Sequence, residues 1–429
     1  MWFNMSSRSI ACVCLISLIS FVAFTTVQVG KERSKYKPSS VQRKTSVERD
    51  LKYLTFGTSQ TWGSTLTNRF EQAYPYLLSP DVKNLAIRGA GPQYPSLCTE
   101  SMVGDELYDV IVLEYPHGET LGELSVLARR LRQRFPDAIM IFTQYWYPLQ
   151  VYVREQGREM SLTEWAELKD VGFLNGEFME EFHKTSVIRD FWQIFPFFAL
   201  SQEKVAKEVG AHMYILPRPK TEELALEGYR HLFNSEDMHH LSERGHKEFA
   251  RGIKEIVEEA LGTYPVDPRL GTWGEGDKCI SWYESGECPL EHSANVILKP
   301  LDERYGFKNS LEIGLGGGAV TIENTFDSPH SLYLSFMATG PSKSRYPTTE
   351  LHFEPRMPGV ESVIIEPHSN KYKFSHHVAL MEKVGVVRPG KTVLIFQPIE
   401  EAQYPFRLVS VALVSEDTAN ANSKVTISF

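Results

Sequence analysis

Short apolar runs alternate with helical hydrophobic patterns through the middle of the chain, from residue 51 to residue 262. Five of these runs predict strands, because they are short and dense in apolar residues, as buried parallel strands are. They lie at 53–56, 82–89, 108–115, 138–146 and 211–217. Helical patterns follow several of them, and this alternation predicts an α/β fold with a parallel sheet.

Two of the helical patterns are well marked. In each, apolar residues recur three and four positions apart and so share one helix face. The faces comprise Leu121, Leu124, Leu127, Ala128, Leu131 and Phe135 in the first helix, and Phe249, Ala250, Ile253, Ile256, Val257 and Ala260 in the second. Gly262 and Pro265 then predict the end of the second helix and of the α/β domain, residues 51–262.

The pattern changes from about residue 273 to a rough alternation of apolar and polar residues, separated by Gly, Pro, Asn and Asp. This is typical of short antiparallel strands and predicts an all-β sandwich over residues 273–429. The predicted strands lie within 310–326, 331–338, 349–355, 361–367, 391–399, 406–414 and 424–429. The glycine-rich run 314–318 lacks a following helix, so it indicates a turn or bulge and no dinucleotide loop.

The amino-terminal leader contains an uncharged apolar segment, residues 10–29. It is about long enough to span a bilayer, so residues 1–29 are a signal anchor or a signal peptide. The basic residues after it would keep the rest of the chain in the cytosol under the positive-inside rule. Its place at the amino terminus and a candidate disulfide favour the lumen. We therefore expect a single-pass protein of the secretory pathway with a basic, flexible stem at 30–50, or a secreted one.

Composition excludes one class of partner. The chain has 429 residues and a formal net charge of −9, which argues against a nucleic-acid binder. Among five cysteines, Cys279 and Cys288 bracket a short loop that a disulfide could close in an oxidising compartment; two reduced thiols are the alternative. Too few cysteines lie together for a zinc site, and we expect neither metal nor cofactor.

Ser59 is a candidate nucleophile, because it directly follows the first predicted strand and its Gly-Thr turn. Ligands of α/β sheets gather at the carboxyl ends of strands, although a lone serine there is more often a turn residue. Asp237 and His240 stand three residues apart just before the last helix. A carboxylate at that spacing can orient an imidazole toward a serine hydroxyl. His239 is the alternative imidazole.

Four blocks in this order resemble the SGNH, or GDSL-type, hydrolase superfamily: FGTSQTWG, NLAIRGAG, DVIVLEY and DMHHLSERGH. The resemblance covers residues 51–261. It implies a three-layer α/β/α fold and ester chemistry, with Ser59 as nucleophile, His240 as general base and Asp237 as its orienting carboxylate. It also implies the N–H groups of Ser59 and Gly89 as oxyanion donors.

The chain departs from the family pattern at two places. Thr58 replaces an aspartate before the serine, where it can still bond within the turn. In the third block the expected asparagine falls on Gly118 or, with a small shift, His117, whose N–H could serve the oxyanion instead. One missing oxyanion donor costs on the order of 10²–10³ in rate, whereas a missing nucleophile or base costs about 10⁶. The sequence therefore favours an enzyme.

Two functions remain. The first is a serine esterase or O-acyl transferase that acts on an ester-bearing carbohydrate or lipid through an acyl-enzyme, with the β domain as an accessory. The second is a non-catalytic glycan-binding or structural protein on a degenerate hydrolase scaffold, which the altered third block motivates.

Overall fold

The computed structural model describes residues 51–115, 121–145, 202–216, 231–234, 240–261, 276–282, 287–300, 309–339, 345–357, 359–367 and 378–423. The apolar leader, the basic stem and the last predicted strand at 424–429 lie outside this part of the chain. Within the described ranges, no helix combines the length and apolar character needed to span a membrane.

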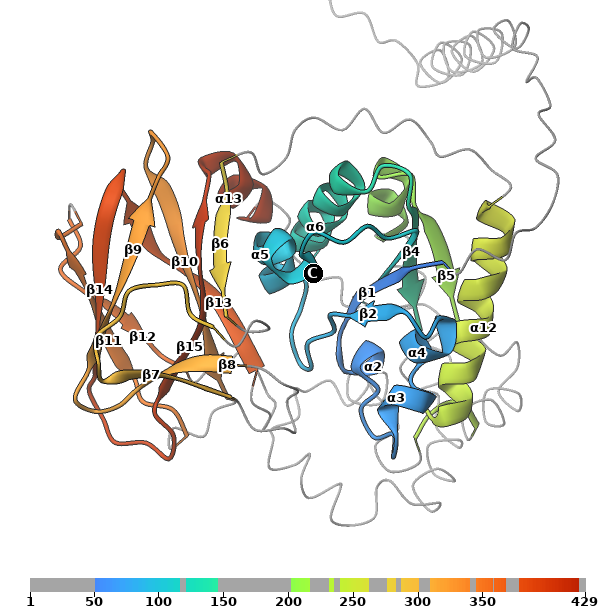
Figure 1. Ribbon diagram of the computed structural model, residues 1–429, viewed down its shortest axis with the longest axis horizontal. Helices are drawn as coiled ribbons and strands as arrows, with labels where there is room; N and C mark the ends of the chain where they lie inside the picture. Colours follow the sequence, from blue (N-terminus) through green and yellow to red (C-terminus); the bar gives the residue numbers. More distant parts are fainter. Residues whose placement is uncertain are drawn as a thin grey trace, which may run out of the picture. The chain divides into compact units, whose positions relative to one another are not determined.

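The predicted parallel sheet is confirmed. Its described strands are β1 (Tyr53–Gly57), β2 (Val82–Asn84), β3 (Val110–Glu114), β4 (Ile139–Gln144) and β5 (His212–Ile215). They pair in parallel in the order β2-β1-β3-β4-β5 (Figure 1). The strand order reverses between β1 and β3, and in such sheets ligands bind outside the carboxyl ends of the strands at this reversal.

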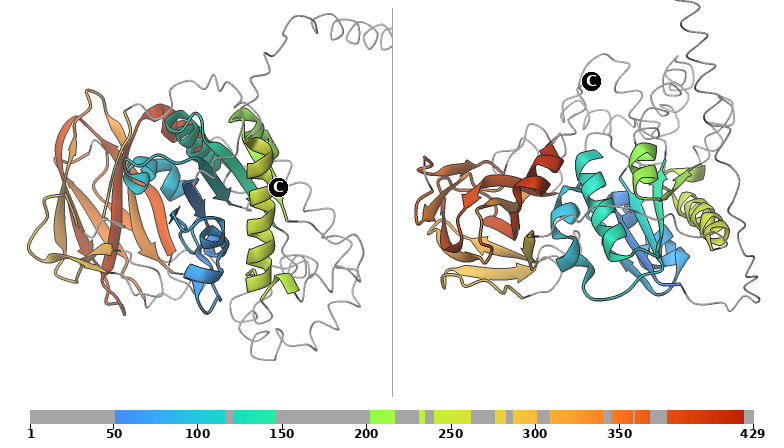
Figure 2. Two further views of the ribbon diagram at one scale, coloured as in Figure 1. Left: turned by 45° about the vertical axis from the view of Figure 1, so that its right-hand side comes forward. Right: turned by 90° about the horizontal axis from the view of Figure 1, so that it is seen from above.

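Helices cover both faces of the parallel sheet, so the region has three layers (Figures 1 and 2). On one face, α5 (Gln93–Val103) and α6 (Leu121–Arg134) share a core with Phe56, Leu113 and Phe142. On the other face, α4 (Tyr74–Leu78) and α12 (Glu243–Ala260) pack on alternate residues of the same strands. The apolar face predicted for α6 is buried from Leu124 to Phe135.

Helix α12 begins where the sequence supplies a cap and buries its predicted face. The Ser242 hydroxyl accepts a hydrogen bond from the Gly245 N–H at 3.1 Å, which satisfies one of the free donors of the first turn. Phe249, Ile253 and Val257 are buried against the sheet.

Gly252 of α12 makes room for Tyr214 of β5, because a Cβ at this position would lie 2.0 Å from the tyrosine ring. We expect Gly252→Ala to lower the free energy of unfolding by about 1–3 kcal/mol, because the added methyl group overpacks this contact. The loss is expected even though alanine has a higher helix propensity than glycine, by about 1 kcal/mol. Urea unfolding measures the loss, and Gly252→Ala with Tyr214→Leu should recover most of it. Glu255→Ala, at an exposed position of the same helix, is the control; equal stability of Gly252→Ala and this control would contradict the close approach.

The second part of the chain forms two antiparallel sheets around an apolar core, as predicted for a sandwich. The first sheet has the order β13-β10-β15-β8-β7, with β6 also paired to β15; the second has the order β12-β11-β14-β9 (Figure 1). The strands are β6 (Lys278–Ser281), β7 (Val296–Pro300), β8 (Asn309–Ile313), β9 (Gly318–Asn324), β10 (His330–Ala338), β11 (Thr349–Glu354), β12 (Val363–Ile365), β13 (Val378–Val387), β14 (Gly390–Pro398) and β15 (Phe406–Val414). The glycine-rich run is a turn between β8 and β9, closed by the Gly317 N–H on the Gly314 carbonyl at 2.9 Å.

Helices α5 and α6 lie between the parallel sheet and the first antiparallel sheet. Their core continues into Tyr333 and Met337 of β10 and into Val409 and Ala412 of β15. Every residue of β10 is buried because both faces of its sheet are covered. The helix α13 (Glu416–Ser423) also contacts α6.

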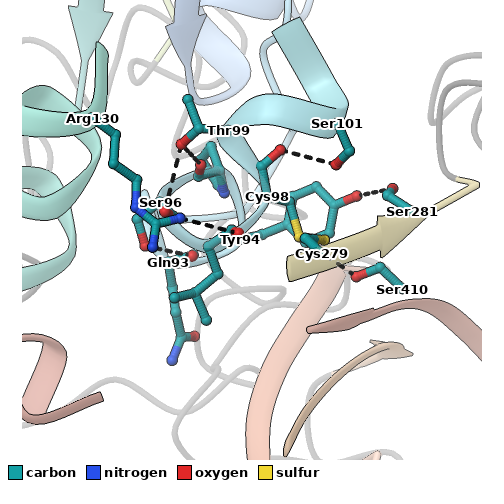
Figure 3. Close-up of a disulfide and its surroundings, with 12 residues drawn as sticks. Gln93, Tyr94, Ser96, Cys98, Thr99, Ser101, Arg130, Cys279, Ser281 and Ser410 are labelled. Atoms are coloured by element: carbon teal, nitrogen blue, oxygen red, sulfur yellow. Dashed lines mark hydrogen bonds between the residues drawn. A yellow bond between two sulfur atoms is a disulfide. The ribbon is translucent and has the colours of Figure 1, made fainter. Parts of the chain in front are cut away.

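The predicted disulfide between Cys279 and Cys288 is wrong. Cys279, in β6, bonds to Cys98 in α5 with a Cα–Cα distance of 5.0 Å (Figure 3). Cys288 is a free, half-buried thiol. The pairing follows from tertiary packing, because α5 lies against β6. Spacing along the chain favoured the nearer cysteine, and the α5 helix had not been predicted.

Polar contacts accompany this disulfide. The Tyr94 hydroxyl of α5 hydrogen-bonds the Ser281 hydroxyl at 2.5 Å (Figure 3). Arg130 of α6 forms an ion pair with Asp277, whose other oxygen accepts from the Ser415 N–H at 2.6 Å. Burial lowers the pKa of Arg130, and the neighbouring Asp277 carboxylate opposes this shift. The α5–α6 layer is thus joined to the antiparallel sheet by covalent, polar and apolar contacts.

Candidate active site

Ser59 lies in a tight turn at the carboxyl end of β1. It is the first residue of the one-turn helix α2 (Ser59–Trp62), and its side chain is half-buried. Thr58 caps this helix, its hydroxyl accepting from the Gln60 N–H at 3.5 Å. The N–H groups at the start of a helix have no partner within it, so the Ser59 N–H is available to a ligand as far as the helix is concerned.

A buried carboxylate lies directly beneath this turn. Glu114 is the last residue of β3 and pairs with Gly57 of β1 across the sheet, where it is fully buried. Its carboxylate accepts hydrogen bonds from the Thr58 N–H at 2.8 Å and the Thr58 hydroxyl at 2.9 Å. It also accepts from the Thr61 hydroxyl at 2.9 Å and the Thr61 N–H at 3.4 Å. The donors stand on both sides of Ser59 in the sequence.

The glycine of the first block provides the space for this contact. A Cβ at Gly57 would lie 2.0 Å from the Thr61 hydroxyl oxygen and 2.7 Å from a carboxylate oxygen of Glu114. No real Cβ approaches other atoms so closely. Residue 57 therefore has to be glycine for the strand end, the turn and the carboxylate to meet.

His240 lies two residues before the cap of α12, and its segment is tied to the Ser59 turn. The buried side-chain oxygen of Gln60, the residue after Ser59, accepts from the Leu241 N–H, the residue after His240, at 2.8 Å. The His240 carbonyl accepts from the Asn234 N–H at 2.7 Å. One direct hydrogen bond thus joins segments that are 181 residues apart in the sequence.

A second histidine, His246, lies in the first turns of α12. It is fully buried, and its Nδ1 accepts from the Tyr74 N–H at 3.2 Å. Burial, and then the nearby charge of His240, lowers the pKa of His246 to about 3, so its ring is neutral. Its Nδ1 lone pair already accepts from the Tyr74 N–H, and its low pKa makes the ring a poor proton acceptor, so His246 is no alternative to His240 as the base.

Gly89, the predicted oxyanion donor, is exposed in the loop after β2 and has a φ of +67°, which favours glycine. The residues before it run alongside β1, where the Ile87 N–H donates to the Gly57 carbonyl at 3.0 Å. Asn84 of the same block donates from its side chain to the Thr61 carbonyl at 2.9 Å. Both bonds attach this loop to the Ser59 turn.

Other predicted site residues lie outside the described part of the chain. These are Asp237, His239, His117 and Gly118, so the predicted Asp237–His240 pair and the altered third block stay predictions. Sequence reasoning missed Glu114 and His246. A charged residue at the end of the apolar run VIVLE was a signal for Glu114, because carboxylates are almost never fully buried without partners.

The arrangement places a hydroxyl at the β1–β3 reversal, next to a segment that carries an imidazole and a loop that carries a glycine N–H. These are the group types needed for a nucleophile, a general base and an oxyanion donor in acyl transfer.

Comparison with known proteins shows the fold. No family of known proteins matches this sequence, and neither does any curated protein. Among solved structures, a two-domain esterase (CEX) active on acetylated mannans, co-crystallized with mannopentaose, is 13% identical, with 85% of this chain and 91% of that chain covered and a TM-score of 0.54. Another crystal structure of a two-domain CEX esterase active on acetylated mannans is 14% identical over the same shares, with a TM-score of 0.49. The first likeness shows that this chain shares the esterase's α/β fold with a following β part.

Proposed function

We propose that this chain is a serine esterase or O-acyl transferase of SGNH type that acts on the acyl esters of a carbohydrate. Ser59 is the nucleophile, His240 the general base and Asp237 the carboxylate that orients it. The observation that carries the proposal is the Gln60–Leu241 hydrogen bond of 2.8 Å, which ties the residue after the nucleophile to the residue after the base.

The proposed reaction proceeds through an acyl-enzyme. The Ser59 hydroxyl attacks the ester carbonyl while His240 takes its proton, and the N–H groups of Ser59 and Gly89 receive the developing negative charge. His240 then protonates the leaving sugar hydroxyl. Water, or a second sugar hydroxyl in the transferase variant, attacks the acyl-enzyme and releases Ser59. His117 is the proposed third oxyanion donor.

Two considerations favour a carbohydrate over a lipid. The likeness to the esterase active on acetylated mannans extends over 85% of this chain, so it includes the β part as well as the α/β part. In this chain the β sandwich packs against the α5–α6 layer of the α/β part, and we assign it the role of an accessory that binds the polymer. Fold likeness alone does not fix a substrate, so lipid esters belong in the test.

The Cys98–Cys279 disulfide supports a place in the secretory pathway, because disulfides persist in oxidising compartments. We propose that the leader at 10–29 directs the chain there, with the α/β and β parts in the lumen or outside the cell, either anchored or released.

An active-site probe tests the proposal. A fluorophosphonate should label the purified protein on Ser59, as located by mass spectrometry of peptides, and Ser59→Ala should abolish labelling. Ser101→Ala, an exposed serine of α5, is the control and should keep it.

Substrate choice is measured as acetate release from acetylated mannan, from acetylated monosaccharides and from short-chain lipid esters. We expect the carbohydrate esters to react faster and Ser59→Ala to be inactive on all of them. A wild-type protein that the probe does not label, and that matches Ser59→Ala on every ester, would instead support the non-catalytic, glycan-binding alternative.

A further inference from the structure

We propose that Glu114 is the positioning residue of the nucleophile: its buried carboxylate holds the turn that presents Ser59 and has to be ionised to do so. This inference deepens the proposed function and rests on it for the role of Ser59. Glu114 does not touch the reacting atoms, so it acts through Thr58 and Thr61.

Hydrogen bonds to the Glu114 carboxylate hold the turn on both sides of Ser59. Four donor groups of Thr58 and Thr61 reach the carboxylate oxygen Oε2, at 2.8, 2.9, 2.9 and 3.4 Å, and the Thr58 hydroxyl also lies 3.1 Å from Oε1. Two of these donors are backbone N–H groups, which can only donate. Both residues belong to the turn, one directly before Ser59 and the other two residues after it. With all four bonds made, the backbone of Ser59 is fixed from both sides.

The hydroxyl groups of Tyr74 and Thr61 form a chain of hydrogen bonds that ends on Glu114. The Thr61 hydroxyl gives its one proton to Glu114, so in its contact with the Tyr74 hydroxyl at 2.8 Å it is the acceptor. Tyr74 therefore donates to Thr61, and Thr61 donates to Glu114. Protonation of Glu114 at its other oxygen, Oε1, would turn that oxygen into a donor, which opposes the hydrogen bond that it accepts from the Thr58 hydroxyl at 3.1 Å. All four donors of Thr58 and Thr61 reach the same oxygen, Oε2. Hydrogen bonds to an ionised acceptor are stronger than those to a neutral one, so the anion holds this turn more firmly than the protonated carboxyl would.

The surroundings of Glu114 also set the pH range in which it ionises. The titratable groups that the described residues place against Glu114 are tyrosines: Tyr74 of α4, its chain neighbour Tyr115, and Tyr145 after β4, which also donates a hydrogen bond to it. Burial raises the pKa of Glu114 from 4.5 to about 7, while the bonds from Thr58, Thr61 and Tyr145 oppose the shift. The carboxyl thus changes charge in the neutral range.

Stability and positioning respond to this change in opposite ways. Because the folded-state pKa lies above the unfolded value, the folded protein is favoured with Glu114 protonated. That stabilisation is present below about pH 4.5 and is lost as the pH rises through about 7. Over the same pH range Glu114 becomes the anion that holds the Ser59 turn. The protein with a positioned Ser59 is therefore less stable than the protein with Glu114 protonated.

The test is the pH dependence of Ser59 labelling by a fluorophosphonate, compared between wild type, Glu114→Gln and Thr61→Val. In wild type, labelling should require a neutral His240 and an ionised Glu114, so the limiting acid slope of log rate against pH should be about 2. Glu114→Gln should lower the rate at alkaline pH by about 10²-fold through misplacement of the hydroxyl, and reduce that slope to about 1.

Thr61→Val keeps the carboxylate but removes one donor to its charged form, so the ionisation near neutrality should move to higher pH. If Glu114 had only a structural role, the pH dependence of Ser59 labelling would be the same in Thr61→Val as in wild type. This variant also carries the test if Glu114→Gln fails to fold. Glu106→Gln, an exposed carboxylate, is the control and should match wild type.

The outcomes separate the two proposals. Labelling of Glu114→Gln with the wild-type rate and profile would overturn the positioning role and leave the proposed function standing. Absence of labelling in wild type would contradict the proposed function. Amide hydrogen exchange over residues 57–63 would then test separately whether Glu114 positions the turn. Faster exchange in Glu114→Gln than in Glu106→Gln supports that role, and equal exchange overturns it.

Discussion

Replacing His240 by alanine is expected to lower the turnover of an acetylated carbohydrate by on the order of 10⁶-fold, about as much as loss of the nucleophile. The reason is that a serine hydroxyl is a weak nucleophile at neutral pH until a base takes its proton. His246 cannot replace His240, because it is buried, its pKa of about 3 makes it a poor proton acceptor, and its Nδ1 already accepts from the Tyr74 N–H.

The measurement is kcat for acetate release, alongside the rate of fluorophosphonate labelling of Ser59. His239→Ala is the matched control, since it removes the neighbouring imidazole, and it should keep activity close to wild type. Loss of activity in His239→Ala with retention in His240→Ala would reassign the base to His239. Wild-type activity in both variants would contradict a histidine as the general base.

Removing the Cys98–Cys279 disulfide is expected to lower the free energy of unfolding by roughly 2–5 kcal/mol. The bond links residues separated by 181 positions, so it closes a long loop in the unfolded chain and restricts that state strongly. It also joins α5 to β6, so its loss weakens the attachment between the α/β part and the sandwich.

Guanidinium unfolding of Cys98→Ala with Cys279→Ala measures this effect, and a reductant added to wild type should reproduce it. Cys288→Ala is the control that the sequence itself supplies, because Cys288 was the predicted partner of Cys279. It is expected to leave stability and the disulfide-linked peptide unchanged. A large loss of stability in Cys288→Ala, with a Cys279–Cys288 peptide in the digest, would contradict the observed pairing.

Local patterns predicted much of the architecture. The apolar spacing in α6 and α12 identified the faces that are now buried, because a helix repeats every 3.6 residues whatever it packs against. The runs at β1, β3 and β4 were equally clear, since strands covered on both faces are apolar throughout. By contrast, α13 was missed because its sequence, EDTANANS, carries little apolar signal, and α5 because no apolar stripe marked it.

The candidate site was predictable only as separate blocks. Motif resemblance selected Ser59 and His240, but nothing in the sequence joined Gln60 to Leu241 or placed Glu114 under Thr58 and Thr61. Those contacts depend on which strands are neighbours. The β2-β1-β3 order puts the end of β3 beside the end of β1, and strand order is a long-range property.

By itself, the sequence determined the fold class, the buried faces of the strands and helices, and the candidate catalytic residues. Each of these depends on the spacing of residues that lie only a few positions apart. Only the tertiary structure decided that Cys279 pairs with Cys98, and that the Ser59 turn stands on a buried carboxylate. Both are contacts between side chains from segments that are distant in the sequence. Their energies depend on burial and on hydrogen-bond partners, which exist only once the chain has folded.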